Sequence, residues 1–202
     1  MLSEPRIAHS PLRTRYGDFI LYVFSWSDNE QDNVLALLSD KQVECPLVRV
    51  QSACYTGEIF ESVDCDCHWQ LETSLRRIQS EGGVFVYMLQ DGRGAGLLAK
   101  VRGMALSATE GIDTADAYKR LGVPPDPRAY EQAAFILKHL GCSSVRLLTN
   151  NPRKIAGLAN QGIAVERVRL ESEPTEQNRG YLKSKALKLG HMMRAFDTDF
   201  IS

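Results

Sequence analysis

The chain has 202 residues, of which 44% are hydrophobic and 24% are charged, and its formal net charge is −1. These values are typical of a globular protein with one real core, and they exclude global disorder. The nearly balanced charge excludes binding to nucleic acid through bulk electrostatics, so an anionic ligand would need a local cluster of basic side chains.

The first 65 residues predict a β-rich unit. Residues 1–15 contain two prolines and no periodicity, and we expect a loose or partly paired arm there. Apolar and aromatic runs separated by polar turns predict three strands, at 16–26, 34–38 and 46–52.

From residue 66 onward, helical and extended patterns alternate. Apolar residues at helical spacing predict helices at 69–81, 97–106, 130–140, 151–160 and 181–193. Short apolar runs predict strands at 84–89, 145–149 and 163–170. A polar, proline-containing stretch joins the second of these helices to the third.

This alternation is typical of α/β layering, whereas the start of the chain is β-rich. We therefore expect a mixed fold class, α+β with α/β character, in one domain of residues 1–202. Its parts would be a β-rich N-terminal part at 1–65, an α/β part at 66–194 and a short C-terminal tail at 195–202.

Three of the five cysteines lie within fourteen residues, as Cys54 and the Cys-x-Cys pair Cys65 and Cys67. Four ligands usually close a structural zinc site, whereas three ligands with an open position are typical of catalytic zinc, which acidifies a bound water. His68 is the nearby residue that could complete a closed site. The alternative is that these are reduced thiols, packed as small hydrophobic side chains.

Several features favour a cytoplasmic location. An odd number of cysteines without a disulfide framework favours a reducing compartment. No apolar run approaches the roughly 18 residues of a membrane span. The first six residues also lack the charged and apolar regions of a signal peptide. We expect neither a membrane nor nucleic acid as a partner.

The glycine-rich turn Gly92-Arg93-Gly-Ala-Gly96 follows a predicted buried strand and opens a helix. Its backbone N–H groups could approach a phosphate, and Arg93 and Lys100 add positive charge there. The turn matches neither a P-loop nor a Rossmann fingerprint, and a plain tight turn is the alternative.

A second strand-to-helix junction reads Thr149-Asn-Asn-Pro-Arg-Lys154. Ligand binding and simple helix capping by Asn150 or Asn151 are both open interpretations. Because both junctions follow strands, they would lie at the carboxyl edge of the sheet, where open α/β sheets bind ligands.

Other polar residues have local interpretations. Asp126-Pro-Arg128 would ordinarily form a surface ion pair, and a role in function requires that its loop fold over the metal. His139 and His191 lie late in predicted helices, where surface or capping roles are expected.

Taken together, these motifs resemble the GTP cyclohydrolase II family over nearly the whole chain. The matching stretches are Arg49-Val-Gln-Ser-Ala-Cys54-Tyr-Thr-Gly-Glu, Cys65-Asp-Cys67-His-Trp-Gln70-Leu, Gln90-Asp-Gly-Arg93-Gly-Ala-Gly, Asp113-Thr114-Ala-Asp-Ala, Asp126-Pro-Arg128, Leu147-Leu-Thr-Asn-Asn-Pro-Arg-Lys154 and Tyr181-Leu-Lys-Ser-Lys-Ala-Leu-Lys-Leu-Gly-His191-Met.

The resemblance implies roles for particular residues. Cys54, Cys65 and Cys67 would hold one catalytic zinc ion. Asp126 would be the proton acceptor, and Arg128 the nucleophile toward the α-phosphorus as pyrophosphate leaves. Residues lining the nucleotide site, with Mg²⁺ on the triphosphate, would be Arg49, Val50, Gln51, Ser52, Ala53, Gln70, Asp91, Gly92, Arg93, Thr114, Thr149 and Lys154.

The resemblance also implies an activity. Members of the family hydrolyse the imidazole ring of GTP in the first step of riboflavin synthesis, and they are generally homodimers. They release formate and pyrophosphate, and the product is 2,5-diamino-6-ribosylamino-4(3H)-pyrimidinone 5′-phosphate. Because arginine is normally protonated, a neighbouring carboxylate such as Asp126 is a reasonable requirement for Arg128 to act as a nucleophile.

The chain departs from the family pattern on the side that would face the base. Gln51 and Ala53 replace a histidine and a glutamate, His68 replaces a glycine and Asp91 replaces a glutamate. Met104 stands where a catalytic tyrosine is usual, close to the reacting base.

These departures keep alternatives open. The chain could stop at the N-formyl, ring-opened product, or act on another purine nucleotide in a specialised pathway. It could also bind a nucleotide without turnover, or carry a purely structural zinc ion.

Overall fold

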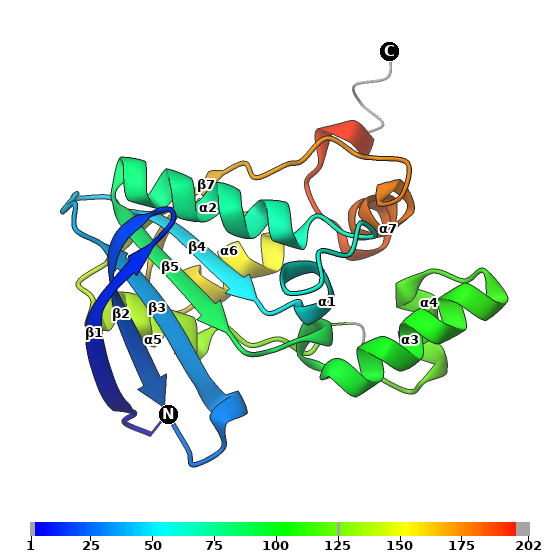
Figure 1. Ribbon diagram of the computed structural model, residues 1–202, viewed down its shortest axis with the longest axis horizontal. Helices are drawn as coiled ribbons and strands as arrows, with labels where there is room; N and C mark the ends of the chain where they lie inside the picture. The colour runs from blue at the N-terminus through cyan, green and yellow to red at the C-terminus, as the bar shows by residue number, and fades with distance from the viewer. Residues whose placement is uncertain (1–2, 125, 197–202) are drawn as a thin grey trace.

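A computed structural model of the chain describes residues 3–124 and 126–196. In this part of the chain, seven strands form one mixed sheet in the order β1-β2-β3-β5-β4-β6-β7 (Figure 1). The strands are β1 (Arg6–Thr14), β2 (Gly17–Ser25), β3 (Asn33–Ser39), β4 (Leu47–Ser52), β5 (Gly83–Met88), β6 (Ser144–Leu148) and β7 (Ala164–Val168).

Seven α-helices surround the described sheet. They are α1 (Tyr55–Glu58), α2 (Cys67–Glu81), α3 (Leu97–Glu110), α4 (Thr114–Arg120), α5 (Glu131–His139), α6 (Pro152–Ala159) and α7 (Arg179–Leu189). Three short 3-10 turns complete the described elements: η1 (Glu30–Asp32), η2 (Gly92–Gly94) and η3 (Arg194–Phe196). None of the described helices has the length and apolar character needed to cross a membrane.

The sheet is antiparallel on one side and parallel on the other. Strands β1, β2, β3 and β5 pair antiparallel, whereas β5, β4, β6 and β7 pair parallel. Parallel strands end at the same edge of a sheet, so the segments after β4, β5 and β6 lie close together. These segments contain the cysteine cluster and both predicted ligand junctions.

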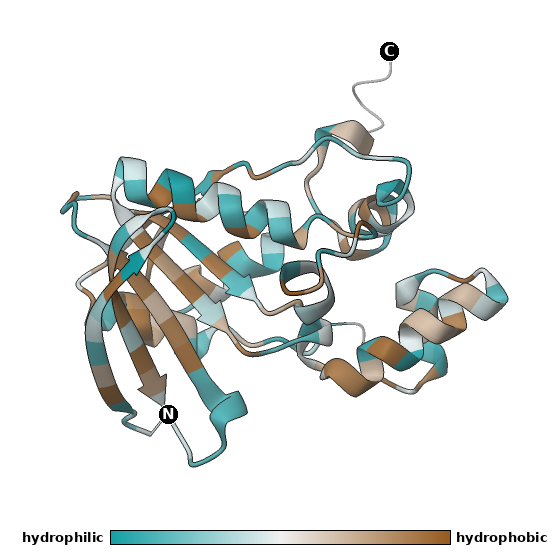
Figure 2. Cartoon of the chain, viewed as in Figure 1, coloured by the Kyte–Doolittle hydropathy of each residue, from teal (hydrophilic) through white to brown (hydrophobic). Residues whose placement is uncertain are grey.

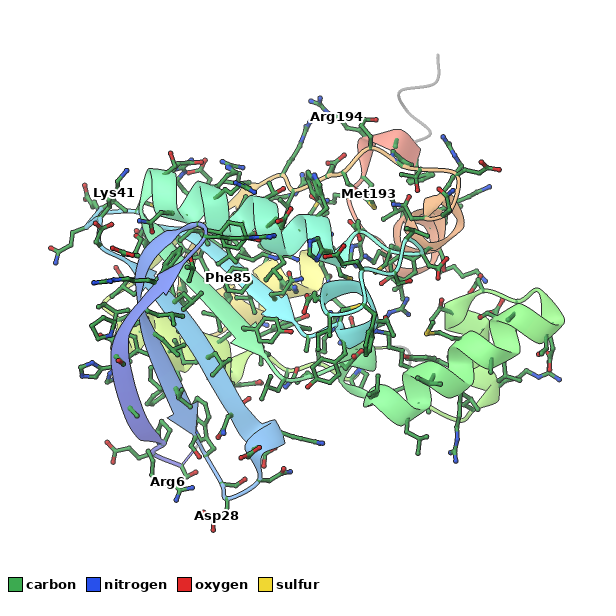
Figure 3. The ribbon with its side chains drawn as sticks, viewed as in Figure 1. Arg6, Asp28, Lys41, Phe85, Met193 and Arg194 are labelled. Carbon is green, nitrogen blue, oxygen red and sulfur yellow. The ribbon has the colours of Figure 1, made fainter. Side chains whose placement is uncertain are left out.

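Two apolar layers cover the two faces of the sheet. On one face, Val48 and Val84 pack in a cluster with Ile136 of α5 and Leu158 of α6. On the other face, Phe85 packs with Leu75 and Ile78 of α2, and it lies beneath α2 in Figure 3. Figure 2 shows the apolar residues concentrated along the strands. Because both faces are covered, β5 is a continuous apolar run, whereas β4 carries the buried polar residues Arg49 and Gln51.

Helices α3 and α4 form a hairpin beside the carboxyl edge of the sheet (Figure 1). Gly103 of α3 lets the ring of Tyr118 approach, since a Cβ at position 103 would lie 2.9 Å from that ring. Lys188 of α7 bonds to Asp116 of α4 at 2.8 Å, which connects the hairpin to the C-terminal helix.

The expected fold class is confirmed, and the long periodic elements lie where the sequence predicts them. Of the two expectations for residues 1–15, the partly paired arm is confirmed, because β1 pairs with β2 from Arg6 to Thr14. Its side chains are mostly exposed on both faces, so no apolar alternation marks this strand.

Helix α1 was not predicted from the sequence, and α4 and α7 also differ from the prediction. Helix α4 lies within the stretch expected to be irregular, and Asp113 caps it by accepting hydrogen bonds from the N–H groups of Ala115 and Asp116. The last predicted helix ends at Leu189 rather than 193, because Gly190 adopts the left-handed conformation (φ 66°) that terminates a helix. Of the expected tail, residues 197–202 lie outside the described residues, as does residue 125 of the proline-rich stretch.

We predict that Gly83→Ala is strongly destabilising, because Gly83 pairs with Leu47 and a Cβ there would overlap the Leu47 carbonyl oxygen. The expected loss in unfolding free energy is about 3 kcal/mol or more. Gly122→Ala is the matched control: its φ is +68°, but no atom lies within 4 Å of the added Cβ, so only about 1–2 kcal/mol should be lost. Equal losses in urea denaturation would contradict the steric argument.

Candidate functional site

A cavity of about 530 Å³ opens at the carboxyl edge of β4, β5 and β6, a volume typical of small-molecule sites. Its wall also includes residues of α3, α4 and α7. The residues assigned from the sequence that line it are Arg49, Gln51, Ser52, Ala53, Cys54, Cys65, Cys67, Gln70, Asp91, Gly92, Arg93, Met104, Thr114, Arg128, Thr149 and Lys154.

Two assigned residues are not part of the cavity wall. The side chain of Val50 is buried in the core, and only its carbonyl reaches the site region, where it accepts a hydrogen bond from Lys154 Nζ at 2.6 Å. Asp126 does not line the cavity itself, but it is ion-paired with Arg128, which does.

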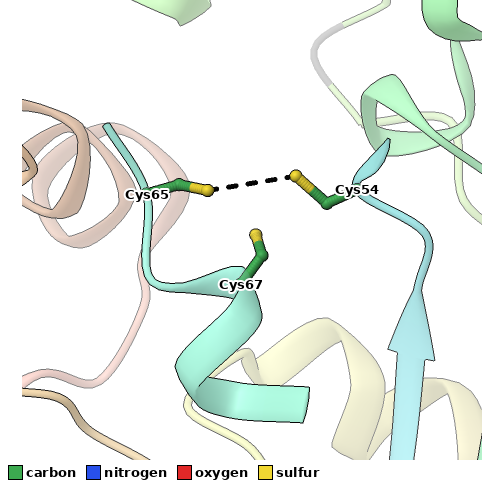
Figure 4. Close-up of side chains that lie close together, drawn as sticks. All are labelled: Cys54, Cys65 and Cys67. Carbon is green, nitrogen blue, oxygen red and sulfur yellow. Dashed lines mark hydrogen bonds between the residues drawn. The ribbon is translucent and has the colours of Figure 1, made fainter. Parts of the chain in front are cut away.

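The three clustered cysteines converge from two segments, Cys54 after β4 and the other two at the start of α2 (Figure 4). Their Sγ atoms all lie within 4.8 Å of one another, and the Cys54–Cys65 Sγ distance is 3.9 Å. In tetrahedral zinc sites, bonds of about 2.3 Å place two sulfurs roughly 3.8 Å apart. The three thiols therefore lie close enough together to hold one metal ion.

His68 does not complete this set. Within residues 3–124 and 126–196, the one group of three or more potential metal ligands so arranged is the three cysteines. The His68 Nε2 atom instead lies 4.0 Å from carboxylate oxygens of Glu61 and Glu72. None of the described side chains therefore adds a fourth metal ligand to the three cysteines.

Lys100 and the neighbouring thiols favour a thiolate at Cys54. Hydrogen bonds from Cys65 and Cys67, together with the Lys100 ammonium 3.1 Å from Cys54 Sγ, hold the pKa of Cys54 well below its ordinary value. The deprotonated sulfur is the form that binds a metal ion.

Asp91 joins the glycine-rich turn to the cysteine segment. It pairs with Lys100 at 3.0 Å and accepts a hydrogen bond from the backbone N–H of Tyr55 at 2.9 Å. The shorter Asp91, which stands where a glutamate is usual, thus reaches both the lysine and the residue after the first metal ligand.

Arg93 is held in an unusual position. Its backbone is left-handed (φ 58°), and its guanidinium lies over the ring of Tyr118 at 5.6 Å. Both terminal nitrogens are buried without a hydrogen-bond partner among the described residues. Because an unpaired buried charge is costly, this guanidinium is suited to an anionic ligand.

Arg49 and Gln51 belong to one buried hydrogen-bond network. Arg49 donates to Gln51 Oε1 at 2.7 Å, to the carbonyl of Leu148 at 2.8 Å and to Gln70. Gln51 in turn donates to Glu58 at 2.8 Å. Burial lowers the pKa of Arg49 to about 10. Gln51 is therefore engaged with protein groups rather than directed freely at a ligand.

The Asp126–Arg128 pair is buried rather than on the surface. The guanidinium donates two hydrogen bonds to the carboxylate, both at 2.7 Å, and the side chains are only 5% and 11% exposed. Burial alone would lower the pKa of Arg128, but the contact with Asp126 outweighs it and raises that pKa. Arg128 is therefore protonated in this arrangement.

Both interpretations of the second junction are compatible with its geometry. Asn151 caps α6 by accepting a hydrogen bond from the N–H of Arg153 at 2.9 Å, and Thr149 and Lys154 line the cavity. Burial lowers the pKa of Lys154 well below its ordinary value.

The sequence reasoning gave no site role to α7, which forms part of the cavity wall. Tyr181, Lys185 and His191 line the cavity, and Lys185 pairs with the buried Asp66, between two of the cysteines, at 3.0 Å. The expected surface position of His191 is wrong, since Gly190 ends the helix and His191 lines the cavity, although its backbone N–H does cap the end of α7. The stretch from Tyr181 to His191 matches a family motif and could have indicated that α7 belongs to the site. Its apolar periodicity predicts only a helix.

Comparison with known proteins identifies the family of this chain. The family profile described as GTP cyclohydrolase II matches residues 5–169. The riboflavin biosynthesis protein RibBA of Bacillus mycoides (strain KBAB4) is 47% identical over 185 residues, which are 90% of this chain and 46% of that protein. RibBA of Chlorobium phaeovibrioides (strain DSM 265 / 1930) is 43% identical over 191 residues, 93% of this chain and 46% of that protein.

The chain spans about half the length of the curated relatives it matches. Among solved structures, RibBX, a two-domain 3,4-dihydroxy-2-butanone 4-phosphate synthase from A. baumannii, is 21% identical with a TM-score of 0.45, over 84% of this chain and 40% of that one. Because the family profile extends over most of the sequence, the chain belongs to the GTP cyclohydrolase II family.

Proposed function

We propose that this chain hydrolyses the imidazole ring of GTP in a zinc-dependent reaction, releasing formate and pyrophosphate and leaving the diaminopyrimidine ribosyl phosphate. The observation that carries the proposal is one cavity lined by three converging thiols, by Arg93, whose terminal nitrogens have no partner among the described residues, and by Arg128, which is ion-paired with Asp126. Membership of the family and the riboflavin-biosynthesis relatives support the same conclusion.

The cysteine cluster is shaped for a metal ion. Gly57 of α1 has no side chain, and this leaves room for the thiols. A Cβ at position 57 would lie 2.7 Å from Cys65 Sγ and 3.3 Å from Cys54 Sγ. Zinc held by Cys54, Cys65 and Cys67 would supply Lewis acidity and activate water near neutral pH. The chain's own contribution is to hold three sulfur ligands together, with Cys54 favoured as the thiolate, at the wall of the cavity.

Basic side chains in the same cavity would bind the triphosphate. Arg93 has unused donors, and Lys154 has no carboxylate partner among the described residues. An Mg²⁺ ion carried by the nucleotide would offset the remaining phosphate charge.

Asp126 and Arg128 would carry out the step at the α-phosphorus. As arranged they form an ion pair, so Arg128 must first lose a proton, and Asp126 is hydrogen-bonded to it at 2.7 Å to accept one. The guanidinium nitrogen would then form a P–N bond as the P–O bond to pyrophosphate breaks. Water would later hydrolyse the P–N bond and restore Arg128.

A second candidate product is the N-formyl, ring-opened compound. Met104, 39% exposed, lines the cavity from α3 and offers a thioether rather than a hydroxyl. Ala53 likewise offers no carboxylate beside the first cysteine. A site with fewer groups for proton transfer near the base favours release before the second hydrolysis.

We predict that the zinc-loaded protein releases formate and pyrophosphate from GTP in equal amounts. Coupled enzymatic assays of both products on the same sample measure the ratio. Pyrophosphate without formate would replace the first product assignment by the N-formyl compound, and GTP binding without either product would indicate a protein without turnover.

Gly57→Ala should reduce zinc content well below one ion per chain, because the added methyl group displaces the Cys65 thiol. Elemental analysis after dialysis measures the stoichiometry. Gly180→Ala is the matched control, a helical glycine with no atom within 4 Å of the added Cβ, and it should retain the metal. Full zinc content in the Gly57 variant would contradict the assigned site.

Arg128→Lys should lower turnover by at least about 100-fold, because lysine keeps the charge but loses the two-bond contact with Asp126 and the reacting nitrogen. Arg120→Lys is the control, since Arg120 is an exposed residue of α4 paired with Glu110. Initial rates of pyrophosphate release decide the matter, and similar rates in the two variants would remove Arg128 from the mechanism.

A further inference from the structure

His191 is fixed against the cavity by contacts on both sides. Its backbone N–H donates to the carbonyl of Lys185 at 3.1 Å, within the turn that ends α7 at Gly190. The next N–H, of Met192, donates to the carbonyl of Asn150 at 2.9 Å, and Arg167 donates to the Met192 carbonyl at 3.0 Å. The segment is thereby anchored to the end of β6, and the imidazole lines the cavity.

Six basic side chains line the same cavity, two of which are Arg49 and Lys100. The four that act on His191 come from the η2 turn, the loop before α5, helix α6 and helix α7: Arg93, Arg128, Lys154 and Lys185. Carboxylates compensate two of them, since Asp126 pairs with Arg128 and Asp66 pairs with Lys185. Neither of the other two has a carboxylate partner among the described residues.

This surrounding keeps the imidazole neutral when no anion is bound. Burial, followed by the nearby charges of Lys185, Lys154, Arg128 and Arg93, lowers the pKa of His191 to about 3. The other polar side chain on this face of α7, Tyr181, contacts the Lys185 ammonium, which lies 4.3 Å from its ring centre. The same four basic side chains attract an anion of several charges. Once bound, its negative charge would make the potential at His191 negative and favour a protonated imidazole.

We propose that His191 is a phosphate-binding residue of this cavity and takes up a proton when a polyphosphate enters. The proposal rests on the proposed function only for the identity of the nucleotide. A neutral imidazole offers one N–H donor, whereas the protonated form offers two and a positive charge. Binding and protonation therefore favour each other.

The direction of the pH dependence follows from this linkage. Since the pKa of His191 is higher in the complex than in the empty cavity, affinity for polyphosphate falls as pH rises through the pKa of the complex. If that pKa is near 7, the protonation strengthens binding about tenfold at pH 6 and has almost no effect at pH 8.

Inorganic triphosphate is the probe, titrated calorimetrically into the zinc-loaded protein at fixed Mg²⁺ in two buffers of different ionisation enthalpy. The wild-type protein should take up as much as one proton more per site at pH 6.5 than His191→Gln. It should also bind about tenfold more tightly than the variant at pH 6, with nearly equal affinities at pH 8. The control is His9→Gln, which changes an exposed histidine of β1 and should match the wild type.

Equal proton uptake by the wild-type protein and the His191 variant would overturn the proposal. An NMR measurement on the wild-type protein would also overturn it, if the His191 imidazole resonance keeps the chemical shift of the neutral form at pH 6 with triphosphate bound. The variant is then needed only to assign that resonance. Formate release from GTP is assayed separately. His191-dependent uptake without formate would contradict the proposed function alone, whereas formate with equal uptake would contradict this inference alone.

Discussion

The parallel pairing of β4 with β5 and β6 is the constraint on which the site depends. Parallel strands share a direction, so the segments that follow them emerge at one edge. That edge brings together Cys54, the turn around Arg93 and the junction that ends at Lys154. Gly83 permits the closest approach in this pairing, where the backbone of β5 meets Leu47. The antiparallel strands β1 to β3 widen the sheet and complete its core.

The second organising feature is the distribution of charge within the cavity. Three carboxylates in and beside its wall are each paired with a base: Asp66 with Lys185, Asp91 with Lys100 and Asp126 with Arg128. Arg93 and Lys154 lack such partners among the described residues. The cavity is thus locally positive in a chain whose net charge is −1. Unpaired buried cations cost stability, and that cost is offset only when an anion is bound.

Sequence patterns predicted the elements that have a buried periodic face and missed those that do not. Helix α2 and strand β5 bury apolar stripes, which mark them clearly. Strand β1 buries almost none of its side chains and is held by backbone hydrogen bonds to β2, which require no particular side-chain pattern. Helix α4 has only seven residues, and its cap at Asp113 was its main sequence signal. Local sequence patterns therefore predict which side chains are buried better than they predict which strands pair.

By itself, the sequence determined the mixed fold class, the clustering of the cysteines, the two ligand junctions and the resemblance to a nucleotide hydrolase. Only the tertiary structure decided that Asp126 and Arg128 are buried together, that Gln51 is engaged by Arg49 and Glu58, and that His191 lines the cavity. The reason is physical. Spacing along the chain specifies which residues share a turn or a face, whereas burial, charge compensation and pKa depend on segments that meet only when the sheet has formed.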